Sequence, residues 1–417
     1  MPRQPRKQTH AGPTGAPPPE GARSPWVRLR SARSHPFIYR RMLGQVDPAA
    51  RPGDVVAVYD KSGLLFGQAL FNPRSQIVLR MLTWGDTPAD DTFWNGAIAR
   101  ALVLRRDLHL DEITDAYRLI HAEGDGLSGL IVERYADCLV FEVFSLGMFQ
   151  RYAHLATILK DSLGAPTRPD RPTTANAQWR VVLRADARTT QIEGFRPPPA
   201  EPVGNVTIRE HGIRYQVDVV SGHKTGFFCD QRDNRARFAE LCRDARVLDV
   251  CCYTGGFGLC AKVLGQAKDV TSVDIDDAAL ALARRNVNLN GARVQLVRSD
   301  AFVYLRQMIE NGRQYDAVVL DPPKLATTRD DIDDALRKYH DLNHLAAHLV
   351  RPAGVLLSCS CSGLVPPARF TETVHHAIRH AGRTAQLFDH TGAAPDHPVM
   401  LNCPESAYLK ALWLRIL

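Results

Sequence analysis

The chain has 417 residues, of which 45% are hydrophobic and 23% are charged, and this composition is typical of a globular protein with two or three domains. It excludes a disordered chain, and no run approaches the roughly 18 uncharged apolar residues that a membrane-spanning helix needs. Residues 1–41 hold nine basic side chains and one acidic one, a net charge of +8, which leaves −1 for residues 42–417. Such a basic arm suits a polyanionic partner, although a solubilising tail would have the same composition.

Residues 1–24 are predicted to form a disordered, basic, Pro-rich arm. They contain no apolar stretch that could act as a secretory signal, so we expect the protein to stay in the cytoplasm, without a membrane partner. Nine cysteines, an odd number without a Cys-x-x-Cys pair, favour reduced thiols over a disulfide framework or a metal site.

Short strands separated by turn residues follow the arm, at 54–60, 64–71 and 77–84. They predict a small β-module within residues 25–95. A helical repeat of apolar residues at 90–108 and strand-like runs after it indicate an α+β middle domain within residues 96–215. A stretch rich in Pro and Thr, 164–177, is expected to be an exposed loop.

Within residues 216–417 the pattern changes to strands alternating with helices. Apolar strands are predicted at 247–251, 270–274, 294–297, 317–320 and 355–359, with amphipathic helices between them. Apolar strands joined by helical crossovers predict a mainly parallel sheet that is covered on both faces. The expected fold is therefore a doubly wound, Rossmann-like α/β domain.

Ligands of such sheets bind beyond the carboxyl ends of the strands. The first strand leads into Asp249-Val-Cys-Cys-Tyr-Thr-Gly-Gly-Phe-Gly258, where glycines let a nucleotide-like ligand approach the backbone, although Cys251 and Tyr253 interrupt the usual glycine spacing. The second strand ends at Asp274, a carboxylate suited to the hydroxyls of an adenosyl ribose.

The third strand is followed by Asp300, Ala301 and Phe302, an acid next to an apolar surface that suits an adenine ring. Taken singly, each of these carboxylates is more simply explained as a helix N-cap. Three acids in order on successive strands favour a nucleotide-like cofactor.

The fourth strand leads into the most specific motif, Asp321-Pro322-Pro323-Lys324. Two prolines make this loop rigid, so it directs the Asp321 carboxylate and the Pro322 carbonyl at the space above the sheet. A plain turn with a capping Asp is the alternative. The fifth strand places a thiol beside the same crevice, with Cys361 expected at the loop edge and Cys359 more deeply buried.

In this order the motifs resemble those of class I S-adenosylmethionine-dependent methyltransferases. More closely, the chain resembles the bacterial 23S rRNA (cytosine-5)-methyltransferases, which join an N-terminal PUA domain to a Rossmann-like catalytic domain. The likeness runs from about residue 28 to the C-terminus. It includes further blocks at Gly124–Leu130, Glu210–Gly212, His223–Arg235, Ser360–Leu364, Asp396–Pro398 and Tyr408–Lys410.

The resemblance implies a function. The module at 25–95 would be a PUA-like β-barrel that binds RNA, and the enzyme would methylate C5 of a cytidine in 23S rRNA or in a large-subunit precursor. S-adenosyl-L-methionine would be the cofactor and S-adenosyl-L-homocysteine the product. The residues expected to hold the cofactor are Gln231, Asp249, Tyr253, Thr254, Gly255, Phe257, Asp274, Asp300, Ala301 and Asp321. A homodimer is compatible with an exposed edge of the PUA-like module.

The implied chemistry requires a thiol, because cytosine C5 is a poor nucleophile until a thiolate adds at C6. By resemblance Cys361 is that nucleophile and Asp321 supports the charge of the adduct. Lys324 is expected to be catalytic with them, and Pro322, Pro323 and Lys324 to contact the substrate. Better-known RNA cytosine-5 enzymes have a second cysteine beside the proline of the Asp-Pro loop. Here that position is Lys324, which puts in doubt how the product is released and leaves its ammonium able to contact a phosphate.

Two other functions remain open at this point. An amino-group methyltransferase, acting on N2 of guanine or N6 of adenine, would use the Asp-Pro-Pro-Lys loop to hold an exocyclic amine. Such enzymes usually place an aromatic residue after the prolines, and Lys324 counts against them. The second alternative is a non-catalytic RNA-binding protein that keeps only an inactive cofactor fold. The five intact site residues argue against it: Asp249, Asp274, Asp300, Asp321 and Cys361.

Overall fold

The computed structural model describes residues 21–166, 178–199, 203–204, 206–220, 222 and 226–417. The arm expected at 1–24 lies outside the described residues except for its last four positions, and so does most of the loop expected at 164–177. In the part of the chain that is described, no helix is long and apolar enough to cross a membrane. All nine cysteines are free thiols.

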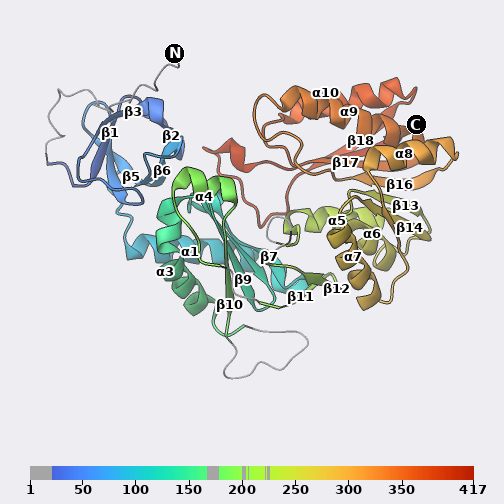
Figure 1. The fold of residues 1–417 in the computed structure, drawn as a ribbon, viewed down its shortest axis with the longest axis horizontal. Helices are drawn as coiled ribbons and strands as arrows, with labels where there is room; N and C mark the ends of the chain where they lie inside the picture. The colour runs from blue at the N-terminus through green and yellow to red at the C-terminus, as the bar shows by residue number, and fades with distance from the viewer. Residues whose placement is uncertain (1–20, 167–177, 200–202, 205, 221, 223–225) are drawn as a thin grey trace, which may run out of the picture.

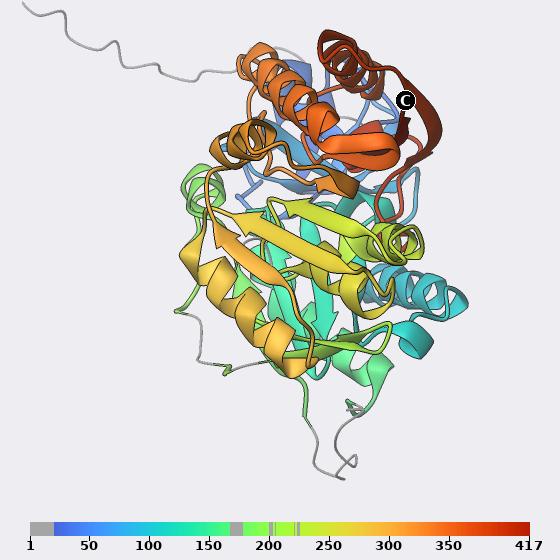
Figure 2. The same ribbon diagram turned by 90° about the vertical axis from the view of Figure 1, so that its right-hand side faces the viewer.

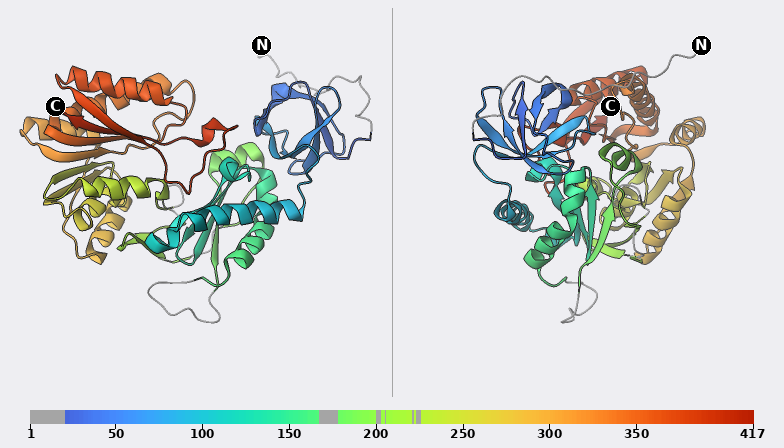
Figure 3. Two further views of the ribbon diagram at one scale, coloured as in Figure 1. Left: turned by 180° about the vertical axis from the view of Figure 1, so that it is seen from behind. Right: turned by 60° about the vertical axis from the view of Figure 1, so that its left-hand side comes forward.

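The N-terminal part is a six-stranded sheet that curls round on itself (Figure 3). Its strands, in the order β2-β6-β5-β4-β1-β3, are β1 (Trp26–Leu29), β2 (Phe37–Tyr39), β3 (Leu43–Val46), β4 (Val55–Tyr59), β5 (Leu65–Phe71) and β6 (Ile77–Trp84). Val27, Ile38, Val56 and Leu79 are fully buried inside it. The strands predicted at 54–60, 64–71 and 77–84 are confirmed as β4, β5 and β6.

The middle part contains a four-stranded sheet in the order β10-β9-β8-β7. Its strands are β7 (Ala116–His121), β8 (Leu130–Tyr135), β9 (Cys138–Val143) and β10 (Arg180–Arg184). Two long helices, α1 (Asp91–Asp107) and α3 (Leu146–Leu163), bury apolar faces against this sheet, because Ile98, Leu155 and Phe141 share one core. The smaller elements are α2 (Leu110–Ile113), α4 (Ala187–Glu193), β11 (Val206–Glu210) and β12 (Ile213–Val217).

The C-terminal part is a seven-stranded sheet in the order β15-β14-β13-β16-β17-β19-β18. Its strands are β13 (Arg246–Val250), β14 (Asp269–Asp274), β15 (Gln295–Arg298), β16 (Tyr315–Leu320), β17 (Val350–Ser360), β18 (Ala385–Thr391) and β19 (Lys410–Ile416). The first five are parallel, and β19 joins β17 and β18 antiparallel. The predicted Rossmann-like, mainly parallel sheet is confirmed, and β18 and β19 are additions that the sequence did not predict.

Helices cover both faces of this sheet (Figures 1 and 2). They are α5 (Arg232–Glu240), α6 (Gly256–Val263), α7 (Asp277–Leu289), α8 (Ala301–Glu310), α9 (Ile332–Leu349) and α10 (Pro367–His380). Alternate residues of β13 explain the two layers: Leu248 packs with α8–α10, whereas Val247 packs with α5 and α6.

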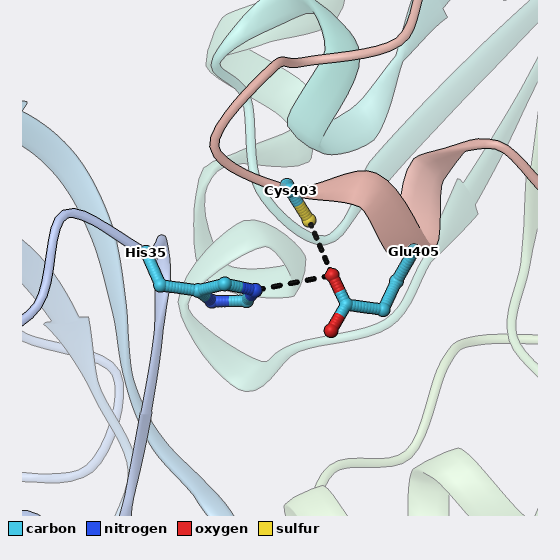
Figure 4. A group of neighbouring side chains, drawn as sticks. All are labelled: His35, Cys403 and Glu405. Carbon is cyan, nitrogen blue, oxygen red and sulfur yellow. Dashed lines mark hydrogen bonds and ion pairs between the residues drawn. The ribbon is translucent and has the colours of Figure 1, made fainter.

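A segment between β18 and β19, which we call the strap (residues 392–409), reaches from the C-terminal sheet towards the N-terminal strands (Figure 1). Figure 4 shows its contact with His35: Glu405 Oε2 lies 3.1 Å from His35 Nε2 and 3.7 Å from Cys403 Sγ. The three ligand atoms are close enough for a metal ion. However, His35 Nδ1 accepts a hydrogen bond from the Phe37 amide, at 2.9 Å. In the neutral imidazole the proton is then on Nε2, which donates to Glu405, and this hydrogen bond accounts for the cluster.

Candidate active site

A cavity of about 610 Å³ opens at the carboxyl ends of β13, β14 and β16, where the parallel sheet predicts a ligand site. Twelve of the fourteen residues expected there line it: Gln231, Tyr253, Thr254, Phe257, Asp274, Asp300, Ala301, Asp321, Pro322, Pro323, Lys324 and Cys361. Asp249 and Gly255 do not line it. Its walls are mostly apolar, with a few convergent polar groups, as is usual for a cofactor pocket.

The loop between β13 and α6 has a left-handed backbone at two positions that are not glycine. Cys251 and Tyr253 have φ of 62° and 49°, in the left-handed region that favours glycine, and Gly255 follows at 82°. The two residues that interrupt the glycine spacing therefore preserve the turn that the spacing normally produces. Gly258 is required for another reason, since a Cβ there would lie 2.1 Å from Ser272 Oγ.

Asp249 acts beneath this loop. Its Oδ2 accepts hydrogen bonds from the Gly258 amide at 2.8 Å and from Ser272 Oγ at 3.2 Å, so it caps the first turn of α6. The side chain is 1% exposed, and burial raises the pKa of its carboxyl to about 7. Its contribution to the cofactor site is to hold the loop, in place of the direct contact that the resemblance implied.

The raised pKa of Asp249 predicts a pH effect on stability. In the unfolded chain the carboxyl ionises near pH 4, so between about pH 4 and 7 the unfolded state binds fewer protons, and this residue makes the fold less stable as the pH rises. Asp249→Asn keeps an acceptor oxygen and cannot ionise. The difference in unfolding free energy between variant and wild type, measured in urea at pH 5 and pH 8, should shift in favour of the variant at pH 8. A difference that does not change with pH would show that Asp249 is ionised at both values.

Asp274 joins two loops at the cavity. Its Oδ2 accepts from the Tyr253 amide at 2.7 Å and its Oδ1 from the Asp276 amide at 3.0 Å. Because each carboxylate oxygen can accept a second hydrogen bond, both oxygens still have room for a pair of ligand hydroxyls. Asp300 is the N-cap of α8 and accepts from the Val303 amide at 3.1 Å. It also lines the cavity, so the helix cap is present and its contact with the cofactor stays a prediction.

Gln231 is the clearest binding group in the cavity. It lies in the 3-10 turn η3 (Cys229–Gln231), is 2% exposed, and its Oε1 accepts from Asn234 Nδ2 at 2.6 Å. That bond turns the amide so that Nε2 lies on the other side, where the Cys359 thiol, a weak acceptor, is close by and no oxygen of the described residues lies within hydrogen-bond distance. A buried donor without an acceptor costs about 1–3 kcal/mol. The carboxylate of a bound methionine moiety would satisfy it.

We therefore expect Gln231→Leu to weaken S-adenosylmethionine binding about tenfold or more, since a hydrogen bond to a charged group contributes about 1.5–3 kcal/mol. Isothermal titration calorimetry measures this directly. The matched control is Gln307→Leu on the exposed face of α8, which should bind as the wild type does. Equal affinity of the Gln231 variant and the wild type would remove Gln231 from the cofactor site.

Buried ion pairs hold η3 in position. Arg232, which follows it, donates from NH2 to Asp396 Oδ1 of the strap at 2.9 Å, and both side chains are fully buried. One turn later Arg235 makes two hydrogen bonds of 2.9 Å to Glu210 of β11. Four of the charged residues in the resemblance blocks thus serve to hold the cofactor side of the cavity.

The thiol of Cys361 also lines the cavity. β17 ends at Ser360, as the following glycine predicts, and Cys361 Sγ stands 3.9 Å from the Pro322 carbonyl oxygen. Cys359 is fully buried in the sheet, and burial raises the pKa of its thiol well above the ordinary value. Of the two cysteines, Cys361 alone lines the cavity.

Hydroxyl groups fix the Asp-Pro-Pro-Lys loop relative to this thiol. Ser362 Oγ accepts from the Leu325 and Ala326 amides, each at 3.1 Å. The Tyr339 hydroxyl lies 2.9 Å from both Ser362 Oγ and Ser360 Oγ. Residues on each side of Cys361 are therefore tied to the end of the loop or to α9.

A buried ammonium adds positive charge near Cys361. Lys410 Nζ donates to the carbonyl oxygens of Ser362 and Tyr408, at 2.6 and 3.0 Å. Burial lowers the pKa of Lys410 to about 8, while the nearby Cys361 opposes this shift and Lys324 adds to it. Positive charge beside a thiol favours the thiolate, which is the nucleophilic form.

Several lining residues were not predicted. Ile275 is 63% exposed in the described chain although it is apolar, and together with Phe302 it offers a flat apolar surface at the second and third strand ends. Its position directly after Asp274, at the end of β14, could have indicated that Ile275 lines the cavity. Phe228, Asp230 and Leu409 come from η3, its N-cap and the strap. They lie within the resemblance blocks His223–Arg235 and Tyr408–Lys410, but no role in the site was predicted for them.

Comparison with known proteins agrees with this geometry. A family model described as S-adenosylmethionine-dependent methyltransferase matches residues 165–415, and a PUA-like domain model matches residues 29–84. The Ribosomal RNA large subunit methyltransferase I of Alteromonas mediterranea is 36% identical over 388 residues, covering 91% of this chain and 94% of that protein. The protein of the same name from Aeromonas hydrophila is 37% identical over 395 residues, covering 92% and 96%.

Solved structures show the same fold. A methyltransferase crystallised with SAH superposes with a TM-score of 0.76 at 20% identity, over 92% of this chain and 96% of that one. A SAM-dependent methyltransferase from Streptococcus mutans gives a TM-score of 0.74 at 19% identity, over 93% and 100%.

Proposed function

Since this chain belongs to the family of S-adenosylmethionine-dependent methyltransferases, we propose that it methylates C5 of a cytidine in large-subunit (23S) ribosomal RNA. Support for the RNA comes from the relatives, which share more than a third of its residues over nearly the whole chain and are named for the large-subunit rRNA. The PUA-like match at residues 29–84 supports an RNA partner.

The single observation that carries the cytosine-5 chemistry is the Cys361 thiol in the cavity wall beside Pro322, within reach of the charge of Lys410. Amino-group methylation needs no thiol, whereas attack through C5 does. Lys324, exposed after the two prolines, is not a stacking platform for a base.

The bonds change in the following order. The Cys361 thiolate forms an S–C6 bond to the extruded cytosine, and the C5=C6 electron pair becomes available at C5. Asp321 hydrogen-bonds the pyrimidine edge and supports the charge that the ring gains. S-adenosylmethionine supplies the methyl group that C5 takes up. A base then removes the C5 proton, the C5=C6 double bond re-forms, and the S–C6 bond breaks to release the thiolate.

We also propose a division of the chain into an arm (1–24), a PUA-like RNA-binding domain (25–95), a middle domain (96–215) and a catalytic domain (216–417). The last strand of the N-terminal sheet ends at Trp84, α1 begins at Asp91 and β12 ends at Val217. These element ends favour boundaries between Trp84 and Asp91 and after Val217, because the bounds 95/96 and 215/216 fall inside α1 and β12. The substrate would bind across the PUA-like domain through its phosphates, with the target base in the cavity.

Methyl transfer from labelled S-adenosylmethionine tests this function. Purified protein is incubated separately with 23S rRNA, 16S rRNA and bulk tRNA, and the labelled nucleoside is identified by mass spectrometry. We expect label in 23S rRNA, as 5-methylcytidine. Label in N2-methylguanosine or N6-methyladenosine would assign the chemistry to the amino-group class, and cofactor binding without transfer to any of the three RNAs would contradict an rRNA enzyme.

A further inference from the structure

A second large hollow lies at the opposite edge of the same parallel sheet. This groove, of about 1360 Å³, opens at the amino ends of β13, β14, β15 and β16, whereas the active-site cavity opens at their carboxyl ends. The two ends of β13 and β14 can be followed in Figure 1. β13 has five residues, so at about 3.3 Å per residue the groove floor is roughly 16 Å from the cofactor loop.

The groove is strongly basic. Six basic residues line it against one acidic residue, Asp269, which gives the lining a net charge of +5. The six are Arg246, Lys262, Lys268, Arg284, Arg293 and Arg313. Residues 42–417 have a net charge of only −1, so positive charge is concentrated here rather than spread over the body.

Most of these cations have no partner among the residues that the structure describes. Lys262 Nζ is bonded to the carbonyl oxygens of Ala267 and Lys268. The side chains of the other five are exposed, and within the described residues none makes an ion pair or a hydrogen bond. Some exposed arginines elsewhere on the same domain are paired, as in Arg298 with Asp277 and Arg351 with Asp316, and what distinguishes the groove is that its cations are gathered in one place. Like charges gathered in one groove repel each other, and a polyanion relieves that repulsion.

We propose that this groove binds the phosphodiester backbone of an RNA segment that lies outside the target nucleotide's immediate surroundings. Arginine forms bidentate hydrogen bonds with phosphate. The remaining polar lining, which includes Asn288, Asn311 and Gln314, can donate further hydrogen bonds to phosphate or sugar. Its two aromatic residues, Tyr304 and Tyr315, are buried and offer no face for stacking bases.

The groove would therefore add affinity without reading sequence. The choice of RNA as the polyanion rests on the proposed function, but the groove itself does not depend on the chemistry at Cys361. An RNA that occupies both sites must extend past the target nucleotide and around the edge of the sheet. Long rRNA fragments should consequently gain from the groove, and a short hairpin that carries only the target site should not.

The test compares two triple variants of the full chain. Arg284→Gln, Arg293→Gln and Arg313→Gln remove three groove charges. Arg100→Gln, Arg188→Gln and Arg285→Gln remove three exposed charges outside the groove, and Arg285 is the chain neighbour of Arg284 on α7. Affinity for a long 23S rRNA fragment and for a short hairpin is measured from 0.05 to 0.3 M salt. S-adenosylmethionine affinity and thermal unfolding report whether each variant is folded.

We expect the groove variant to bind the long RNA at least about tenfold more weakly at 0.1 M salt, with the slope of log Kd against log salt reduced by about two to three. Hairpin binding and S-adenosylmethionine affinity should match the control variant. Equal binding of the long RNA by the two triple variants would overturn the proposal. Normal RNA binding by wild type without methyl transfer would instead count against the proposed function and leave the groove assignment intact.

Discussion

Cys361→Ala is expected to lower methyl transfer to RNA by at least about a thousandfold while leaving S-adenosylmethionine affinity unchanged. Without the S–C6 bond, C5 of the bound cytosine keeps the low reactivity of the free base, and positioning alone recovers only part of the rate. The effect should fall on kcat, because Cys361 is expected to act on the base, whereas Gln231 and the β13–α6 loop are the residues expected to hold the cofactor. Single-turnover transfer from labelled S-adenosylmethionine measures it.

Cys359→Ala is the matched control, two residues earlier in the chain, on β17. Its thiol is fully buried and does not line the cavity, so activity should remain within about fivefold of wild type while stability falls by about 1 kcal/mol through the lost packing. If both variants keep wild-type rates, the thiol is not the nucleophile and the chemistry belongs to the Asp-Pro-Pro-Lys loop.

Asp396→Asn should destabilise the fold by about 3–5 kcal/mol, the usual cost of leaving a buried charge without its partner. Arg232 and Asp396 are both fully buried, and Asp396 Oδ2 also accepts from the Arg118 amide at 2.8 Å. Burial opposes ionisation here, but His397 and Arg232 hold the pKa of Asp396 well below its usual range. The stabilisation is thus present above the unfolded pKa and is lost as the pH falls through the lowered one. Urea unfolding at pH 7 measures the difference.

The exposed pair of Arg237 with Asp389 provides the comparison, since more than a third of each side chain is accessible. Asp389→Asn should leave the unfolding free energy unchanged within error, because solvent screens such pairs. Equal destabilisation by the two substitutions would show that the Asp396 pair is no more important than a surface contact. The Asp396 variant should also bind S-adenosylmethionine more weakly, because Arg232 follows Gln231 directly.

The sequence predicted the catalytic fold because its strands are continuous apolar runs with helical crossovers, a pattern that depends only on local residues. The Rossmann-like fold class, the PUA-like module and the S-adenosylmethionine-dependent chemistry are confirmed. Strands β1, β2 and β3 were missed because they are three or four residues long and irregular in register.

Contacts between residues that are far apart in the sequence could not be predicted from local sequence patterns. The stretch from Asp230 to Arg235 reads as the polar surface of a helix, yet Arg232 is fully buried because Asp396, 164 residues later, pairs with it. The strap that supplies Asp396 has no regular apolar period, so its role was not predicted. Backbone conformation was also beyond the sequence pattern. Cys251 and Tyr253 interrupt the glycine spacing, yet their backbone adopts the left-handed conformation in which glycine is usually found.

The most direct test of the central claim is to trap the Cys361 adduct. A 23S rRNA fragment containing 5-fluorocytidine is incubated with protein and S-adenosylmethionine. Because C5 then carries fluorine in place of the hydrogen that a base must remove, the thiolate cannot be expelled and the S–C6 bond persists after methyl transfer. We predict a denaturant-stable protein–RNA complex that requires S-adenosylmethionine, with the methylated nucleotide on the Cys361 peptide by mass spectrometry and no complex for Cys361→Ala. No complex with wild type, under conditions in which unmodified RNA becomes methylated, would contradict the thiolate mechanism.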